Sequence, residues 1–160
     1  MKYLRLRRIA ITILLSGVIC ILLSLTACGS TLNSVKSMLN RKYGVKLPSD
    51  TELVYCHYES KDSFHGDGAD YLVFKFKKEP TGVIANFKSL NLKDGENPDE
   101  LKNELIEFFN SAISLVNEIP QEYLPDWDSE MIWNYGGPFD GLSAIYYPES
   151  MEMIVCIITT

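Results

Sequence analysis

The residues best suited to metal or acid–base chemistry lie between positions 57 and 70. His65, Asp67 and Asp70 stand close together in a glycine-containing segment, and His57 precedes them in an apolar run. The oxygen ligands of such a segment suit a hard cation such as Ca²⁺. However, the spacing does not match an EF-hand loop, and a single histidine inside the segment supplies too few of the nitrogen and sulfur ligands that zinc prefers. Aspartate and glycine are also the usual residues of a hairpin turn, so a polar or metal site and a plain turn both stay open.

Cys56 and His57 could in principle supply a nucleophile and a base. They are neighbours in a stretch with strand character, and neighbouring strand residues point to opposite faces, so they cannot act on each other. Cys56 could meet His65 across a hairpin, but no sequence signature supports this pair, and a thiol buried in a strand is usually inert. We therefore assign no catalytic residue, and the sequence implies no cofactor.

Cys28 closes a segment with the three parts of an export signal. The apolar run Ile9–Leu25 has 17 residues and is followed by the small residues Thr26 and Ala27. This run is at the short end of what spans a bilayer, and basic residues before it are held on the cytoplasmic side. Those basic residues are Lys2, Arg5, Arg7 and Arg8.

The four residues Leu25-Thr26-Ala27-Cys28 resemble the lipobox of bacterial lipoproteins. The resemblance implies that residues 1–27 are a signal peptide that is removed, and that Cys28 becomes the acylated first residue, followed by a short tether to residue 31. Two acyl chains anchor a protein stably, whereas one chain binds only marginally. We expect a protein attached by lipid to the outer face of the cytoplasmic membrane. The alternative is an uncleaved N-terminal membrane helix with a chance cysteine.

Charge excludes one class of partner. Without residues 1–27 the chain has 133 residues, a normal size for one domain, with 11 basic and 21 acidic residues and a net charge of −10. Such a surface repels nucleic acid and anionic lipid headgroups, so we expect no nucleic-acid partner. The partners expected are the membrane, through the lipid on Cys28, and a protein or small ligand that the sequence does not identify.

Cys56 and Cys156 are the two cysteines that remain after Cys20 and Cys28 are assigned to the signal and the anchor. In an exported chain they can form a disulfide. They can equally serve as small, unpaired core residues. Each lies in an apolar run where either state fits, so both alternatives stay open.

Hydrophobic periodicity predicts a single α+β domain over residues 32–160. A short helix is expected over residues 32–43 and a long one from Pro98, capped by Asn97 and ended by Pro120. Residues 51–59 and 70–78 predict a hairpin, with Leu53, Tyr55 and His57 on one face of its first strand and a wetter face on its second. Three more strands are expected over residues 131–135, 142–147 and 153–159. The result is a largely antiparallel sheet, a hairpin plus a three-stranded C-terminal meander, covered by one long and one short helix that we expect to pack on one face.

The mature part resembles small exported lipoproteins of Gram-positive bacteria that carry no assigned activity. The resemblance rests on residues 43–48 (Tyr-Gly-Val-Lys-Leu-Pro) and 64–68 (Phe-His-Gly-Asp-Gly), and it implies no mechanism. The loop containing Gly136, Gly137 and Phe139 is the best candidate for a recognition loop. We expect a non-enzymatic binding or interaction module at the cell envelope. The alternatives are a small exported hydrolase or metal-dependent enzyme, and an envelope inhibitor or immunity-type protein.

Overall fold

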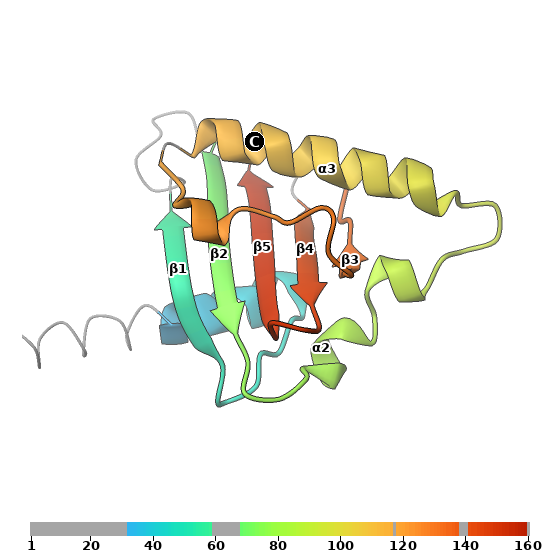
Figure 1. The fold of residues 1–160 in the computed structure, drawn as a ribbon. Helices are drawn as coiled ribbons and strands as arrows, with labels where there is room; N and C mark the ends of the chain where they lie inside the picture. Colours follow the sequence, from blue (N-terminus) through green and yellow to red (C-terminus); the bar gives the residue numbers. More distant parts are fainter. Residues whose placement is uncertain (1–31, 59–67, 117, 138–140, 160) are drawn as a thin grey trace, which may run out of the picture.

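One five-stranded antiparallel sheet forms the centre of the protein in the computed structural model (Figure 1). The structure describes residues 32–58, 68–116, 118–137 and 141–159. The strand order is β1-β2-β5-β4-β3. The strands are β1 (Glu52–Tyr58), β2 (Gly68–Lys75), β3 (Ile132–Asn134), β4 (Leu142–Tyr147) and β5 (Glu152–Thr159).

This sheet is the predicted hairpin joined to the predicted meander. β1 pairs with β2, while β3, β4 and β5 follow one another as antiparallel neighbours. The two parts meet where β2 pairs with β5 along eight residues, from Gly68 opposite Thr159 to Lys75 opposite Glu152. The predicted α+β class is therefore confirmed.

Helices cover both faces of the sheet, so the prediction that they pack on one face is wrong. The long helix α3 (Pro98–Leu115) crosses one face, and the helix over residues 32–43 lies behind the other (Figure 1). Three shorter helical segments are α2 (Thr81–Ile84) and the 3₁₀ turns η1 (Lys88–Leu90) and η2 (Gln121–Tyr123). Among the described residues, no helix is long and apolar enough to cross a membrane.

Helix α3 begins as the sequence predicts and ends earlier. The Asn97 side chain accepts a hydrogen bond from the Asp99 backbone N–H, which satisfies one of the free donors at a helix start. The helix ends at Leu115, and Val116 already has extended backbone angles. Pro120, which was expected to end it, instead stands directly before η2.

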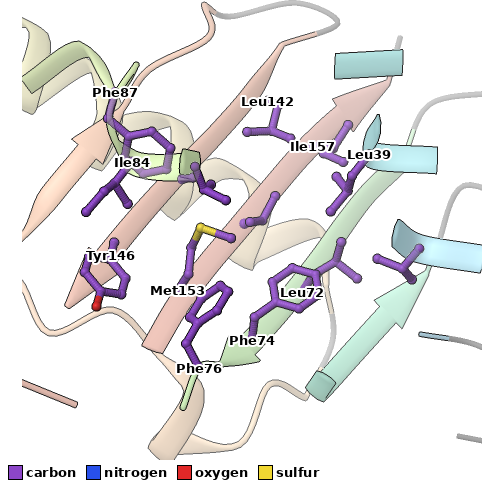
Figure 2. Packing of buried hydrophobic residues seen from close by; sticks show 14 residues of the cluster. Leu39, Leu72, Phe74, Phe76, Ile84, Phe87, Leu142, Tyr146, Met153 and Ile157 are labelled. Atoms are coloured by element: carbon purple, nitrogen blue, oxygen red, sulfur yellow. The ribbon is translucent and has the colours of Figure 1, made fainter. Parts of the chain in front are cut away.

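Apolar side chains form one core on each side of the sheet. The core under helix 32–43 takes Val35 and Leu39 from that helix, and Figure 2 shows its sheet residues meeting Ile84 and Phe87 from the α2 region. The core under α3 takes Leu105, Phe109 and Ala112 from α3, and these three side chains are completely buried. We call these the N-helix core and the α3 core.

The prediction of a wetter face on β2 is wrong. Leu72, Phe74 and Phe76 belong to the N-helix core, as their alternation predicts. Tyr71 and Val73, on the opposite face, lie in the α3 core with at most 2% of their surface exposed. The reason is the tertiary structure, because β2 is an inner strand with a helix layer on each side. Alternate residues of β2 therefore point into two different cores, and neither set points into water.

The predicted faces of β1 are also wrong in part. The pairing with β2 shifts between Leu53, which faces Phe74, and Tyr55, which faces Val73. Val54 is therefore the extra residue of a β-bulge, which reverses the alternation after it. As a result Leu53 packs with the N-helix core, whereas Val54 and Tyr55 both pack with the α3 core.

Candidate functional site

The polar cluster predicted around the hairpin is only partly within the described residues. His65 and Asp67 lie outside them. His57 stands opposite Tyr71, and Asp70 stands opposite Tyr58. Since Tyr71 lies in the α3 core and Asp70 alternates with it, His57 and Asp70 point to opposite faces of the sheet. The structure therefore does not bring these two residues together.

Each of these two residues has its own surroundings. Asp70 is buried, with 7% of its surface exposed. The Nε2 atom of His57 is buried and has no hydrogen-bond partner among the described residues. No three histidine, cysteine, aspartate or glutamate side chains of the described part of the chain converge as a metal site would require.

Cys56 and Cys156 are both free, so the disulfide alternative is not the one observed. Cys56 packs with the N-helix core on β1, and Cys156 lies in the α3 core on β5. The two strands are separated by β2, so the thiols differ in strand and in face. Burial raises the pKa of the Cys56 thiol to about 11 and raises the pKa of Cys156 further, which suits small core residues better than nucleophiles.

The candidate recognition loop is described only at its base. Phe139 lies outside the described residues, and Gly137 has a positive φ of 100°. A Cβ on Gly136 would lie 2.5 Å from the Leu142 carbonyl oxygen, and a Cβ on Gly141 would lie 2.6 Å from the Gly136 carbonyl oxygen. The base of the loop is therefore a close backbone contact that only glycine permits.

A pocket of about 240 Å³ opens beside α3 on the same face of the sheet, and the sequence did not predict it. We call it the acidic pocket. Its floor is Val73 of β2, Tyr147 of β4 and Ile154 of β5. Its walls come from the segment after α3 and from the β4–β5 turn: Glu122, Tyr123, Leu124, Asp126, Ser129, Glu130, Glu149, Ser150 and Glu152.

Tyrosines fix the wall of the acidic pocket to the sheet. The Tyr71 hydroxyl donates a hydrogen bond of 2.7 Å to the Tyr123 carbonyl oxygen. The Tyr55 ring stacks on the Tyr123 ring with 5.0 Å between centroids. At the other end the Asp126 backbone N–H donates to the Tyr147 hydroxyl at 3.0 Å. These contacts hold the segment at both ends, because buried tyrosines supply apolar area and a polar tip together.

Hydrogen bonds from neighbouring residues stabilise the charged form of Asp126. Its carboxylate accepts a hydrogen bond of 2.6 Å from the Ser129 hydroxyl and one of 3.1 Å from the Asp128 backbone N–H. These bonds favour the charged form and lower the pKa of Asp126. The opposite effect is seen at the floor, where burial raises the pKa of Tyr147 to about 12.

The acidic pocket therefore combines carboxylates with an apolar floor. Five carboxylates line it, and Glu152 is paired with Lys75 at 2.7 Å. The others, Glu122, Asp126, Glu130 and Glu149, are exposed to solvent. Such a pocket suits a cationic group carried on an apolar stem, such as a lysine or arginine side chain.

Sequence reasoning missed this site because its parts are remote from one another. The lining residues span positions 73 to 154, and each carboxylate alone is an ordinary surface residue in an acidic chain. The one usable signal was the apolar content of residues 123–127, which had to pack on the sheet somewhere. Nothing in the sequence showed where.

A second pocket, of about 310 Å³, lies on the other side of the sheet. Its polar residues include Lys46, Asn86 and Asn134, and the Asn134 amide donates to the Leu142 carbonyl oxygen at 3.2 Å. Tyr43 also lines it, and the Tyr43 hydroxyl is buried without a partner among the described residues. Among the described residues that line it there is no carboxylate, in contrast to the acidic pocket.

Comparison with known proteins gives no family model, no curated protein and no solved structure that matches this chain.

Proposed function

We propose that the protein is a lipid-anchored, extracytoplasmic binding protein whose acidic pocket receives a cationic side chain of a partner. The anchor is supported by the lipobox-like residues 25–28 behind a basic and apolar start. The binding role is supported by one observation above all: carboxylates from two separate segments converge over an apolar floor. The partner class is a protein or peptide with an accessible lysine or arginine.

The binding half is tested with a trilysine peptide as the probe, in titrations followed by NMR. We expect Glu122→Gln, Glu130→Gln and Glu149→Gln together to weaken binding about tenfold or more, because close charge pairs contribute about 1 kcal/mol or more each when partly desolvated. A matched variant removes three exposed carboxylates elsewhere, through Asp50→Asn, Glu79→Gln and Asp94→Asn. Equal loss in both variants would mean that net charge alone attracts the peptide.

A second peptide separates charge from shape. Trilysine acetylated on its side chains and on its α-amino group keeps the length and the apolar stems but loses its positive charges. We expect no measurable binding of the acetylated peptide. If both peptides shift the same resonances with the same affinity, the proposed cationic recognition is wrong.

The anchor half has its own test in cells. Cys28→Ser should abolish labelling by radioactive palmitate and should block removal of residues 1–27, since acylation needs the thiol. Cys56→Ser is the matched control and should change neither result. Unchanged labelling of the Cys28→Ser protein would exclude acylation at this residue.

A further inference from the structure

Charge is distributed unevenly along the mature chain. Residues 32–46 carry Lys36, Arg41, Lys42 and Lys46, which are four of the 11 basic residues that follow position 27. The same segment contains none of the 21 acidic residues. The mature chain, with a net charge of −10, therefore contains one segment that is positively charged. Anionic surfaces need not repel this segment.

The fold exposes three of these four basic side chains to solvent. Helix 32–43 buries Val35 and Leu39 against the sheet, and its solvent side carries neutral polar residues and basic residues only. Arg41 and Lys42, in the last turn, and Lys46, just after the helix, are exposed. We call Arg41, Lys42 and Lys46 the basic face.

Lys36 has a different role and is not part of the basic face. Its Nζ atom donates hydrogen bonds to the carbonyl oxygens of Pro48 (2.8 Å) and Ser49 (3.2 Å). These bonds hold the chain after the helix against the helix itself. A purely local explanation also exists for Arg41 and Lys42, because cations stabilise a helix C-terminus. That explanation does not extend to Lys46, which stands beyond the helix end at residue 43.

The position of the basic face relative to the anchor decides what it meets. Residue 32, the first described residue of the helix, follows Cys28 by four residues, and four extended residues reach about 14 Å at most. A lipid on Cys28 therefore keeps the start of this helix within reach of the headgroups, and Arg41, the first residue of the basic face, follows nine residues later, about 14 Å along the helix axis. The acidic pocket opens on the opposite face of the sheet, the α3 side, so docking of the helix side leaves the pocket directed away from the membrane.

We propose that the basic face docks on anionic lipid headgroups and sets the orientation of the domain at the membrane. This inference rests on the lipid anchor proposed above. Polybasic segments next to an anchor are attracted by anionic lipid, and one acyl chain plus such a segment can replace a second acyl chain.

The test uses the mature chain, residues 28–160, with a single myristoyl chain coupled to Cys28 through a maleimide. All proteins carry Cys56→Ser, so that coupling is confined to Cys28; Cys156 is completely buried. Partition is measured by flotation with vesicles of phosphatidylcholine alone and with about one third phosphatidylglycerol, at low salt. We expect tighter partition to the anionic vesicles, and a smaller difference as salt shortens the screening length.

The decisive variant is Arg41→Gln, Lys42→Gln and Lys46→Gln together. We expect its partition to anionic vesicles to fall about fivefold for each charge removed, with little change on neutral vesicles. The matched control, Lys77→Gln, Lys78→Gln and Lys93→Gln, removes three exposed charges elsewhere and should keep the anionic preference. A Lys42→Arg, Lys46→Arg protein keeps the charge and should behave as the parent protein.

Three outcomes would overturn the proposal. One is a parent protein that shows no preference for anionic vesicles. Another is a loss of partition to anionic vesicles that is equal in both triple variants. The third is a triple variant that loses binding to soluble polyphosphate but keeps its partition to vesicles, which would assign the face to a polyanion in solution. Since the acyl chain is attached chemically, none of these results depends on whether the cell acylates Cys28, and a failed palmitate experiment would leave them valid.

Discussion

Cys56 lies half-buried on β1 and faces the N-helix core, near the carboxylate of Asp70. Burial is the main cause that raises the pKa of its thiol to about 11, and the Asp70 charge adds to the effect. Because the thiolate is the reactive form, the residue is protected at neutral pH without a disulfide. Cys156, on the other face, is completely buried.

We predict that Cys56 reacts slowly with iodoacetamide at pH 8 and about tenfold faster for each pH unit up to about 11, as the thiolate fraction rises. Cys156 should react only after unfolding. Mass spectrometry of the folded mature chain identifies the modified residue. Rapid modification of either thiol at pH 7 would contradict the burial seen here.

The same shift predicts a loss of stability in alkali. The pKa of Cys56 in the folded protein, about 11, lies above the ordinary thiol value of 9.0 that applies to the unfolded chain. Below pH 9 both states hold the proton, so the contribution is fully present; between pH 9 and 11 the unfolded state ionises first and the free energy of unfolding falls. Cys56→Ala should remove part of this fall in the free energy of unfolding. The rest of the fall should stay, because burial also raises the pKa values of Tyr71 and Tyr147 and these groups still ionise first in the unfolded chain.

At the scale of single elements, the base of the loop after β3 carries a clear constraint. A Cβ on Gly141 would lie 2.6 Å from the Gly136 carbonyl oxygen, and the atoms that crowd both glycines belong to the backbone. We predict that Gly136→Ala and Gly141→Ala each lower the free energy of unfolding by about 1–3 kcal/mol. Urea unfolding of the two variants measures this.

Gly82 supplies the matched control for that prediction. It lies in α2 and has nothing within 4 Å of an added Cβ. Gly82→Ala should therefore be neutral or stabilising by up to about 1 kcal/mol, since alanine is the better helix former. If Gly136→Ala behaved like Gly82→Ala, the loop base would have to be looser than described.

The elements also show where sequence reasoning succeeds and fails. The cap at Asn97 and the strand over residues 142–147 were predictable because their signals are local. The bulge at Val54 was not, because it arises from pairing with β2 and reverses a face assignment that rests on strict alternation. The acidic pocket was invisible for the same reason: its carboxylates meet only after η2 packs over β2, β4 and β5.

At the scale of the whole molecule, the sheet joins two cores that have different helices. Phe74, Val155 and Met153 serve the N-helix core, while their strand neighbours Val73 and Ile154 serve the α3 core. Every inner strand thus contributes to both sides. This arrangement predicts that the two layers do not unfold separately, although the helices that cover them are remote in sequence.

Leu39→Ala tests this coupling from the side that carries no tryptophan. Leu39 is completely buried in the N-helix core, so the variant should lose about 2–5 kcal/mol. Trp133 belongs to the α3 core and Trp127 packs against it, so tryptophan fluorescence reports the other layer.

We expect the urea midpoint of Leu39→Ala measured by fluorescence to fall as far as the midpoint measured by far-ultraviolet circular dichroism. Leu105→Ala, in the α3 core, should give the same agreement between the two midpoints. A fluorescence midpoint that stayed at the parent value in Leu39→Ala, while the helical signal was lost earlier, would show that helix 32–43 detaches alone. The basic face could then leave the sheet without unfolding it, and docking at the membrane would not orient the acidic pocket.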